Sequence, residues 1–174
     1  MSTRAKILLM DANILIDYQK SDFSILGTVA RHLGEVYVLS TILDEVDELT
    51  PALCERQGFK VIEPQLDHLL EAASKRGRLS FRDHLCLLVA RDQGLTCVTN
   101  DKPLRRACQD ESVSVLWGLE LMTELVDLGR LQARTAIDTA QQIHRSNPLH
   151  IPQSLVDRFT QKVLKIDSKK KRPS

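Results

Sequence analysis

Short apolar runs alternate along this chain with longer amphipathic segments, and this alternation limits the fold more than any other feature. The short runs occupy positions 6–10, 36–39, 59–62, 96–99 and 113–117, each with the length of a single strand. Stretches with helical spacing separate them, at 12–18, 24–33, 41–49, 65–75, 80–92 and 103–108. Such alternation is typical of βαβ units around a parallel sheet. We therefore predict a three-layer α/β/α sandwich whose central parallel sheet has about five strands.

Glycines stand near the expected ends of several helices. Gly34, Gly58, Gly77 and Gly94 each follow a helical stretch. Because glycine adopts a left-handed backbone conformation at little cost, it commonly ends a helix. We expect these four residues to be helix caps.

The strand pattern stops near position 118, and helical spacing continues at 119–128, 131–144 and 154–164. We predict an α/β domain over 1–118 and a helical extension over 119–166. The extension is too short to form a core of its own easily, so we expect it to pack on the same domain. Its leucines, Leu121, Leu125, Leu128 and Leu131, would either cover the edge of the core or form a dimer contact. Residues 167–174 are rich in lysine and are predicted to be a basic, disordered tail.

Composition sets wider bounds. With 174 residues and 43% hydrophobic content, the chain suits one globular domain. Its formal charge of +1 leaves no global positive field to attract nucleic acid, although local patches remain open. The four cysteines form no C-x-x-C pair, which favours reduced, intracellular thiols. No leader or membrane-length apolar stretch is evident, so we expect a cytoplasmic protein without a membrane partner.

Four carboxylates, Asp11, Glu45, Asp83 and Asp101, stand where a predicted strand gives way to a helix or within a helix's first turns. In a parallel sheet, the loops beyond the carboxyl ends of the strands converge on one crevice. Taken alone, Asp11, Asp83 and Asp101 can each be explained as a helix N-cap, and Asp83 completes a capping box with Ser80. Glu45 alone can be explained as part of a solvated acidic face. Four independent caps on one rim would be a coincidence. The set therefore predicts a site for Mg²⁺ or Mn²⁺, which prefer hard oxygen ligands.

Glu45 is chosen from a crowded acidic segment. If 41–49 is one helix, its buried stripe consists of Ile42, Leu43, Val46 and Leu49. Glu45 then lies at the edge of that stripe, while Asp44 and Glu48 point away, and Asp47 is the second choice.

Taken in order, these segments resemble a known family. Asp11-Ala12-Asn13, the stretch from Ser40 to Glu45, Asp83 at a helix start, and Thr99-Asn100-Asp101 followed by Leu104 resemble the motifs of PIN-domain ribonucleases. The toxins of VapBC-type toxin–antitoxin pairs are the most similar members in size and layout. The similarity covers about residues 5–118. The helices after 118 depart from the short toxins and resemble a PIN-like subgroup instead.

The resemblance implies a metal-dependent endoribonuclease of PIN-like fold, with Asp11, Glu45, Asp83 and Asp101 as catalytic and metal-binding residues. Thr99 and Asn100 stand at the family's supporting positions. Asn13 either orients a carboxylate or is a turn residue. An RNA substrate, a small antitoxin partner and a homodimer are further implications of this likeness.

Basic side chains flank two of the acids. Arg82, Lys102, Arg105 and Arg106 either bind RNA phosphates at the rim or form ordinary solvated surface. Aromatic residues make up only 4% of the chain, so no platform for stacking bases is evident.

Three alternatives compete with the nuclease interpretation. A haloacid-dehalogenase-type phosphotransferase needs a second Asp two residues after Asp11, where Asn13 stands. A receiver domain, suggested by Lys102-Pro103, needs an acceptor Asp after the third strand, where Glu63 and Pro64 stand. The third alternative is a catalytically silent PIN-like module that binds RNA or protein, although such a module has no reason to retain four mutually repelling acids.

Overall fold

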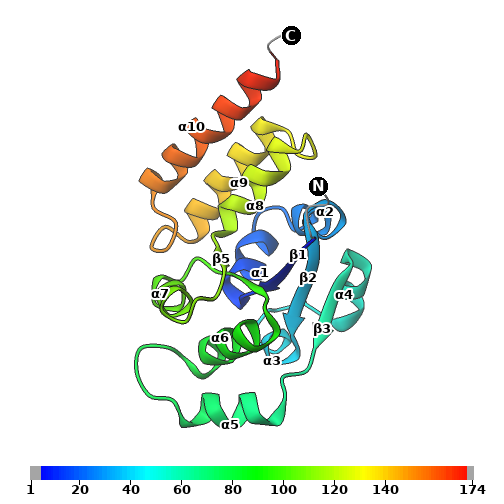
Figure 1. Cartoon of the computed structure of the whole chain (residues 1–174). Coiled ribbons are helices and arrows are strands. Elements are labelled where there is room, and N and C mark those ends of the chain that lie inside the picture. The colour runs from blue at the N-terminus through cyan, green and yellow to red at the C-terminus, as the bar shows by residue number, and fades with distance from the viewer. Residues whose placement is uncertain (1–4, 172–174) are drawn as a thin grey trace.

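A computed structural model describes residues 5–171 and confirms the predicted three-layer α/β/α architecture (Figure 1). Within that range one sheet of parallel strands has the order β3-β2-β1-β4-β5. The strands are β1 (Lys6–Met10), β2 (Gly34–Leu39), β3 (Phe59–Ile62), β4 (Thr96–Val98) and β5 (Val115–Leu116). The strand order changes direction between β1 and β4. Ligand crevices in open α/β sheets lie at such a switch point.

Helices cover both faces of the sheet. They are α1 (Ala12–Gln19), α2 (Ser24–His32), α3 (Ser40–Leu43), α4 (Pro51–Gln57), α5 (Leu66–Ser74), α6 (Phe81–Gln93), α7 (Lys102–Asp110), α8 (Gly118–Asp127), α9 (Ala133–Ser146) and α10 (Gln153–Lys170). Right-handed crossovers place the helices before β3 on one face and α6 and α7 on the other. Accordingly α2 packs on β2 and α4, whereas α6 packs on α7 and β4. Helix α5 packs on α6.

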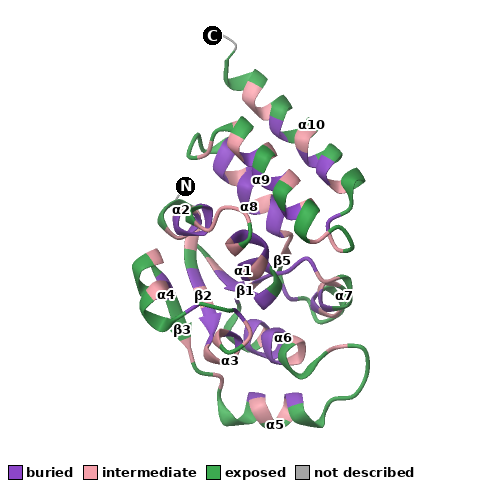
Figure 2. Ribbon diagram, turned by 180° about the vertical axis from the view of Figure 1, so that it is seen from behind, coloured by how far each residue is buried: buried purple, intermediate pink, exposed green. Residues whose placement is uncertain are grey.

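The strands are apolar because both of their faces are buried. Leu8, Leu9 and Met10 of β1 and Val98 of β4 have no exposed surface, and the buried residues gather at the centre of the fold (Figure 2). Each such side chain contributes roughly 1.5–3 kcal/mol through burial. This central pair of strands is therefore a rigid base for the residues that follow it.

Two of the four glycine caps are confirmed. Gly58 and Gly94 end α4 and α6 in left-handed conformations, with φ of 80° and 65°. Gly77 lies in the loop beyond α5, whose last residue is Ser74 and whose C-cap is Lys75. Gly34 was also misassigned as a cap, because it is the first residue of β2. A Cβ atom at Gly34 would lie 2.0 Å from the Lys6 carbonyl oxygen, so close pairing with β1 requires glycine there.

The predicted helix over 41–49 is wrong. Helix α3 ends at Leu43, and turns follow as far as Glu48, which has a positive φ of 61°. Ile42, Val46 and Leu49 are buried, as predicted for the apolar stripe. They are buried by a compact turn, however, and not by a continuous helix.

Helix α4 was not predicted, although local signals mark it. Thr50 accepts a hydrogen bond from the Leu53 N–H, Pro51 occupies the first turn, and Gly58 ends the helix. A Thr-Pro start with a glycine stop is a helix signature that hydrophobic spacing alone does not reveal.

The C-terminal helices pack on the α/β domain and on one another. Helix α8 contacts α2, α9 and α10, and α9 contacts α1. Leu121 and Leu125 are fully buried, whereas Leu128 is largely exposed. The expected disordered tail is wrong for 167–170, because α10 continues to Lys170, whose ammonium donates to the Val126 carbonyl at 2.7 Å. Residues 172–174 of that predicted tail lie outside the described range.

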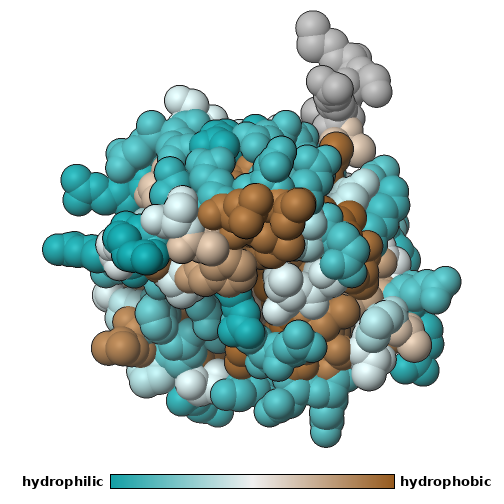
Figure 3. Space-filling model, turned by 90° about the horizontal axis from the view of Figure 1, so that it is seen from below, coloured by the Kyte–Doolittle hydropathy of each residue, from teal (hydrophilic) through white to brown (hydrophobic). Residues whose placement is uncertain are grey.

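Apolar side chains are exposed on the outer surface of α5. Helix α5, at the bottom of Figure 1, exposes Leu66 and Leu70, with 68% and 61% of their surface accessible. The surface seen from that side shows an apolar patch among hydrophilic side chains (Figure 3).

Across residues 5–171, no helix combines the length and apolarity needed to cross a membrane.

The close approach at Gly34 gives a stability prediction. Gly34→Ala should lower the free energy of unfolding by about 2–4 kcal/mol, because the added Cβ collides with backbone of the central strand. Urea denaturation measures the change. Gly27→Ala is the matched control, since its Cβ would meet only the ends of the flexible Gln57 and Arg31 side chains and alanine favours helix. Equal stability of the two variants would contradict the tight β1–β2 pairing.

Candidate functional site

Asp11 lies at the switch point of the sheet, directly after β1. Its backbone N–H donates to the Val98 carbonyl at 3.0 Å and so extends the pairing of β1 with β4. Although Asp11 occupies the N-cap position of α1, its side chain makes no capping hydrogen bond. Instead its Oδ2 accepts from the Thr99 hydroxyl at 2.8 Å. The carboxylate is only 4% exposed, so the simple capping interpretation fails for this residue.

Burial and neighbouring charge both act on Asp11. Burial is the largest influence and raises the pKa of its carboxyl to about 6, while the Thr99 hydrogen bond acts in the opposite direction. The negative charges of Asp83 and Asp101 raise the pKa further. Three of the four predicted acids are therefore close enough to interact electrostatically, and a cation among them would relieve the repulsion.

Asp83 is a helix cap and a neighbour of Asp11 at once. Its Oδ2 accepts from the Ser80 N–H at 3.0 Å, and its own N–H donates to the Ser80 hydroxyl at 3.1 Å. The predicted capping box is therefore present. Because its charge also raises the pKa of Asp11, the two interpretations of Asp83 hold together.

Asp101 caps α7 through Oδ1, which accepts from the Leu104 N–H at 2.8 Å. Its backbone N–H donates to the Thr99 hydroxyl oxygen at 3.1 Å. That same hydroxyl donates to Asp11. The Thr99 hydroxyl therefore bonds to both acidic residues and fixes the spacing between them.

Glu45 stands apart from this group. Its carboxylate forms an ion pair with Arg82, and both line a shallow cavity with Thr41, Ser80 and Phe81. The choice of Glu45 within the acidic segment rested on a helix that does not form. Burial nevertheless distinguishes it, because Asp44, Asp47 and Glu48 are exposed whereas the Glu45 side chain is 27% exposed.

The acids lie near one another but do not form a preformed metal-binding site among residues 5–171. Among residues 5–171, no three His, Cys, Asp or Glu side chains stand close enough together to hold a metal ion. The donor set of Asp11, Asp83 and Asp101 fits Mg²⁺ or Mn²⁺ in its chemistry and electrostatics. Two of these carboxylates, however, are turned toward the N–H groups of their own helices. Metal binding would therefore compete with capping.

Asn13 and Asn100 have different environments. Asn13 is exposed and lies in the first turn of α1, so it is a helical residue rather than the turn residue given as an alternative. Asn100 is buried: its Nδ2 donates to Asp17 at 3.1 Å, and its Oδ1 accepts from the Gly118 N–H at 2.9 Å. Sequence reasoning missed Asp17. The available signal was an acid within the apolar stripe of Ile14 and Tyr18.

The four predicted RNA-binding cations separate into two pairs. Arg82 is engaged by Glu45, and the Arg105 guanidinium stacks on the Trp117 ring, 3.7 Å from its centroid. Burial lowers the pKa of Arg105, which marks a packed rather than a free cation. Lys102 and Arg106 are exposed and line a groove of about 550 Å³.

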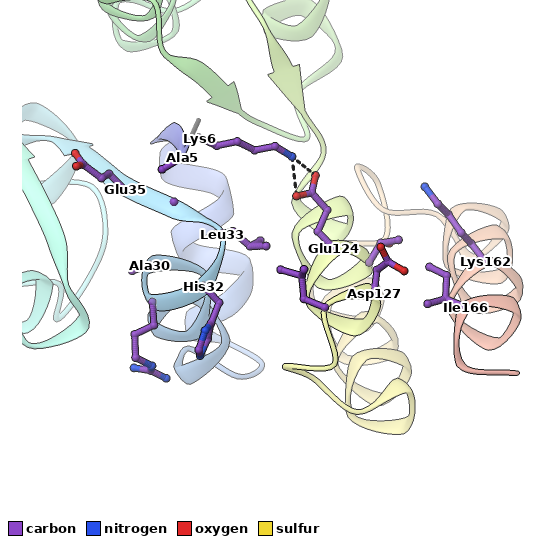
Figure 4. Close-up of a pocket in the computed structure, with 14 residues that line it drawn as sticks. Ala5, Lys6, Ala30, His32, Leu33, Glu35, Glu124, Asp127, Lys162 and Ile166 are labelled. Atoms are coloured by element: carbon purple, nitrogen blue, oxygen red, sulfur yellow. Dashed lines mark hydrogen bonds and ion pairs between the residues drawn. The ribbon is translucent and has the colours of Figure 1, made fainter. Parts of the chain in front are cut away.

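A larger groove, of about 880 Å³, opens at the opposite edge of the sheet (Figure 4). It lies at the amino ends of β1 and β2, between α2, α8 and α10. Lys6 and Glu124 face each other across it in an ion pair of 2.5 Å. Because these charges satisfy each other and the carboxylates lie at the other edge, this groove is separate from the candidate site.

Compared with known proteins, the sequence matches no family model and no curated protein.

The raised pKa of Asp11 gives a pH prediction. Because the folded state holds the proton more tightly than the unfolded state, Asp11 makes stability fall as pH rises from about 4 to about 6. Asp11→Asn should therefore be more stable than wild type at pH 7, by on the order of 2–3 kcal/mol, and nearly equal at pH 4. Urea denaturation at both pH values measures this. Burial also raises the pKa of Asp17, but both proteins share that residue, so a pH-independent difference would contradict the prediction.

Proposed function

We propose that this protein is a metal-dependent endoribonuclease that hydrolyses RNA phosphodiester bonds at the switch point of its sheet. One observation carries the proposal: the pKa of the Asp11 carboxyl is raised mainly by burial and further by the negative charges of Asp83 and Asp101. A protein gains no stability from this arrangement, and perturbed acids in a crevice mark functional sites. The ordered motifs that resemble PIN-domain ribonucleases support the same proposal.

In this proposal Asp11, Asp83 and Asp101 hold Mg²⁺ or Mn²⁺. Glu45 joins them only when its ion pair with Arg82 breaks. The bound ion would supply a nucleophile from water and stabilise charge on the phosphate. Thr99 keeps Asp11 and Asp101 at a fixed spacing through its two hydrogen bonds. Burial of Asp11 excludes water from its carboxylate and strengthens its attraction to a cation.

A second candidate is a catalytically silent module that binds RNA or a protein partner. The ion pair of Glu45 with Arg82 and the capping bonds of Asp83 and Asp101 favour it, because they occupy three of the four acids. Under that function the acids are structural caps, and only Asp11 lacks a structural explanation.

The groove beside α7 is the proposed path of the RNA backbone. Arg78, which precedes α6, joins Lys102 and Arg106 in lining this groove, together with Leu79, Pro103, Ala107 and Asp110. Within residues 5–171, these three cations take part in no ion pair. Free cations next to Asp101 would bind phosphates near the reacting bond. A cytoplasmic location, a small antitoxin and a homodimer accompany this proposal as predictions.

Cleavage tests the proposal directly. Purified protein with structured RNA should cleave after addition of Mn²⁺ or Mg²⁺, and Asp11→Asn should reduce the rate by about a thousandfold, equivalent to roughly 4 kcal/mol. Asp138→Asn, an exposed acid on α9, is the matched control and should retain full activity. Gel analysis of end-labelled RNA follows the reaction. Identical cleavage by wild type and Asp11→Asn would indicate a contaminant and favour the silent module.

RNA binding is measured separately, in EDTA, by fluorescence anisotropy of a labelled single-stranded RNA. Replacing Arg78, Lys102 and Arg106 together by Gln should weaken binding and lower the salt dependence by about 2 in log–log slope, at about 0.7 per phosphate contact. The control replaces three exposed arginines of the C-terminal region, Arg130, Arg145 and Arg158. An equal loss in both triple variants would show general charge attraction and exclude the groove as the specific path.

A further inference from the structure

A buried polar network connects α1, the β4–α7 loop and the C-terminal helices. At its centre is Asp17, which is only 3% exposed. Its Oδ2 accepts from the Asn100 amide at 3.1 Å, and its Oδ1 accepts from the Asn147 amide at 3.0 Å. Asn147 ends α9, 130 positions further along the chain. Both oxygens of one buried acid are therefore satisfied by two distant segments.

The network is polar, whereas the surrounding core is apolar. Each side chain in it has a hydrogen-bond partner. A buried carboxylate is tolerated only when donors satisfy it. Asn100 uses its other end to accept from the Gly118 N–H at 2.9 Å, and the Tyr18 hydroxyl donates to the Gly118 carbonyl at 2.8 Å. The five residues thus hold one another at the junction of the α/β domain and the extension.

The packing leaves little room for these groups to shift. A Cβ atom on Gly118 would lie 2.8 Å from Ile14 and 3.1 Å from the Asn100 amide nitrogen. Asn100 is consequently held from two sides, by Asp17 and by the start of α8.

Asn100 is also the central residue of the segment that builds the carboxylate site. The residue before it, Thr99, donates to Asp11, and the residue after it, Asp101, caps α7. Because the peptide chain is continuous, displacement of Asn100 moves both neighbours. The position of the acids therefore depends on a contact made at the far end of α9.

We propose that Asp17 and Asn147 are positioning residues that make α8 to α10 part of the support of the carboxylate site. The extension thereby acts on the site through Asn100 without contacting substrate. The effect on metal binding rests on the proposed function, whereas the mechanical coupling does not.

Two single variants and a double variant test the coupling. Asp17→Asn leaves one acceptor oxygen where the carboxylate has two, so either the Asn100 or the Asn147 amide loses its acceptor. Asn147→Ala removes only the link to the extension. In the double variant Asp17→Asn with Asn100→Asp, the amide introduced at 17 donates to the carboxylate introduced at 100. That carboxylate still accepts from Gly118, and the oxygen at 17 still accepts from Asn147. All the original hydrogen bonds have counterparts, so the double variant should rescue the site.

The first measurement is native-state hydrogen exchange, which needs no metal. Both single variants should speed exchange at the Asp101 and Leu104 amides by about tenfold, while the double variant restores the wild-type rate. Core amides of Leu26 and Val29 report any global loss of stability. Gln142→Ala, an exposed amide on the same helix, is the control. Unchanged exchange at Asp101 and Leu104 in both single variants would overturn the proposal, as would failure of rescue in a folded double variant.

The second measurement is Mn²⁺ affinity by calorimetry. The single variants should bind about tenfold more weakly than wild type, and the double variant should recover. If wild type binds no Mn²⁺ but exchange responds as expected, the coupling stands and the proposed function fails. If wild type binds Mn²⁺ and all variants bind equally, the positioning role fails and the proposed function stands.

Discussion

The pairing of β1 with β4 is the interaction on which the rest of the site depends. Met10 of β1 pairs with Val98 of β4, and one further hydrogen bond extends this pairing: the Asp11 N–H donates to the Val98 carbonyl at 3.0 Å. Thr99 then bridges Asp11 and Asp101 with a single hydroxyl. Because buried strands fix all three residues, the site has a rigid base rather than a flexible loop, as precise chemistry requires.

Two buried carboxylates, Asp11 directly before α1 and Asp17 within it, illustrate how a structural acid differs from a candidate functional acid. Asp17 has two amide donors and supports the junction with the C-terminal helices. Asp11 has one side-chain donor and two negative neighbours, so its burial is only partly compensated. The first acid is satisfied by the protein itself. The second needs a proton or a cation, and this difference is the physical basis for assigning it a function.

Much of this arrangement was predictable from local sequence. The limits of β1 and β3 follow from their apolar runs, and Asp11 and Asp101 follow from their place after strands. Glu45 was selected by assuming a helix where turns form, because a spacing of apolar residues does not distinguish the two over one turn. Its partner Arg82, the stacking of Arg105 on Trp117, and the bond from Asn147 to Asp17 were not predictable. Each depends on register and packing between segments far apart in sequence.

The most direct test of a cation-dependent acid at the switch point is the proton balance of Mn²⁺ binding. Calorimetry at pH 6 in two buffers of different ionisation enthalpy counts the protons released. Because the pKa of Asp11 is about 6, binding should release about half a proton at pH 6 and almost none at pH 8. Asp11→Asn should abolish the release. Binding with no proton release at pH 6, or the same release from Asp11→Asn, would contradict the account.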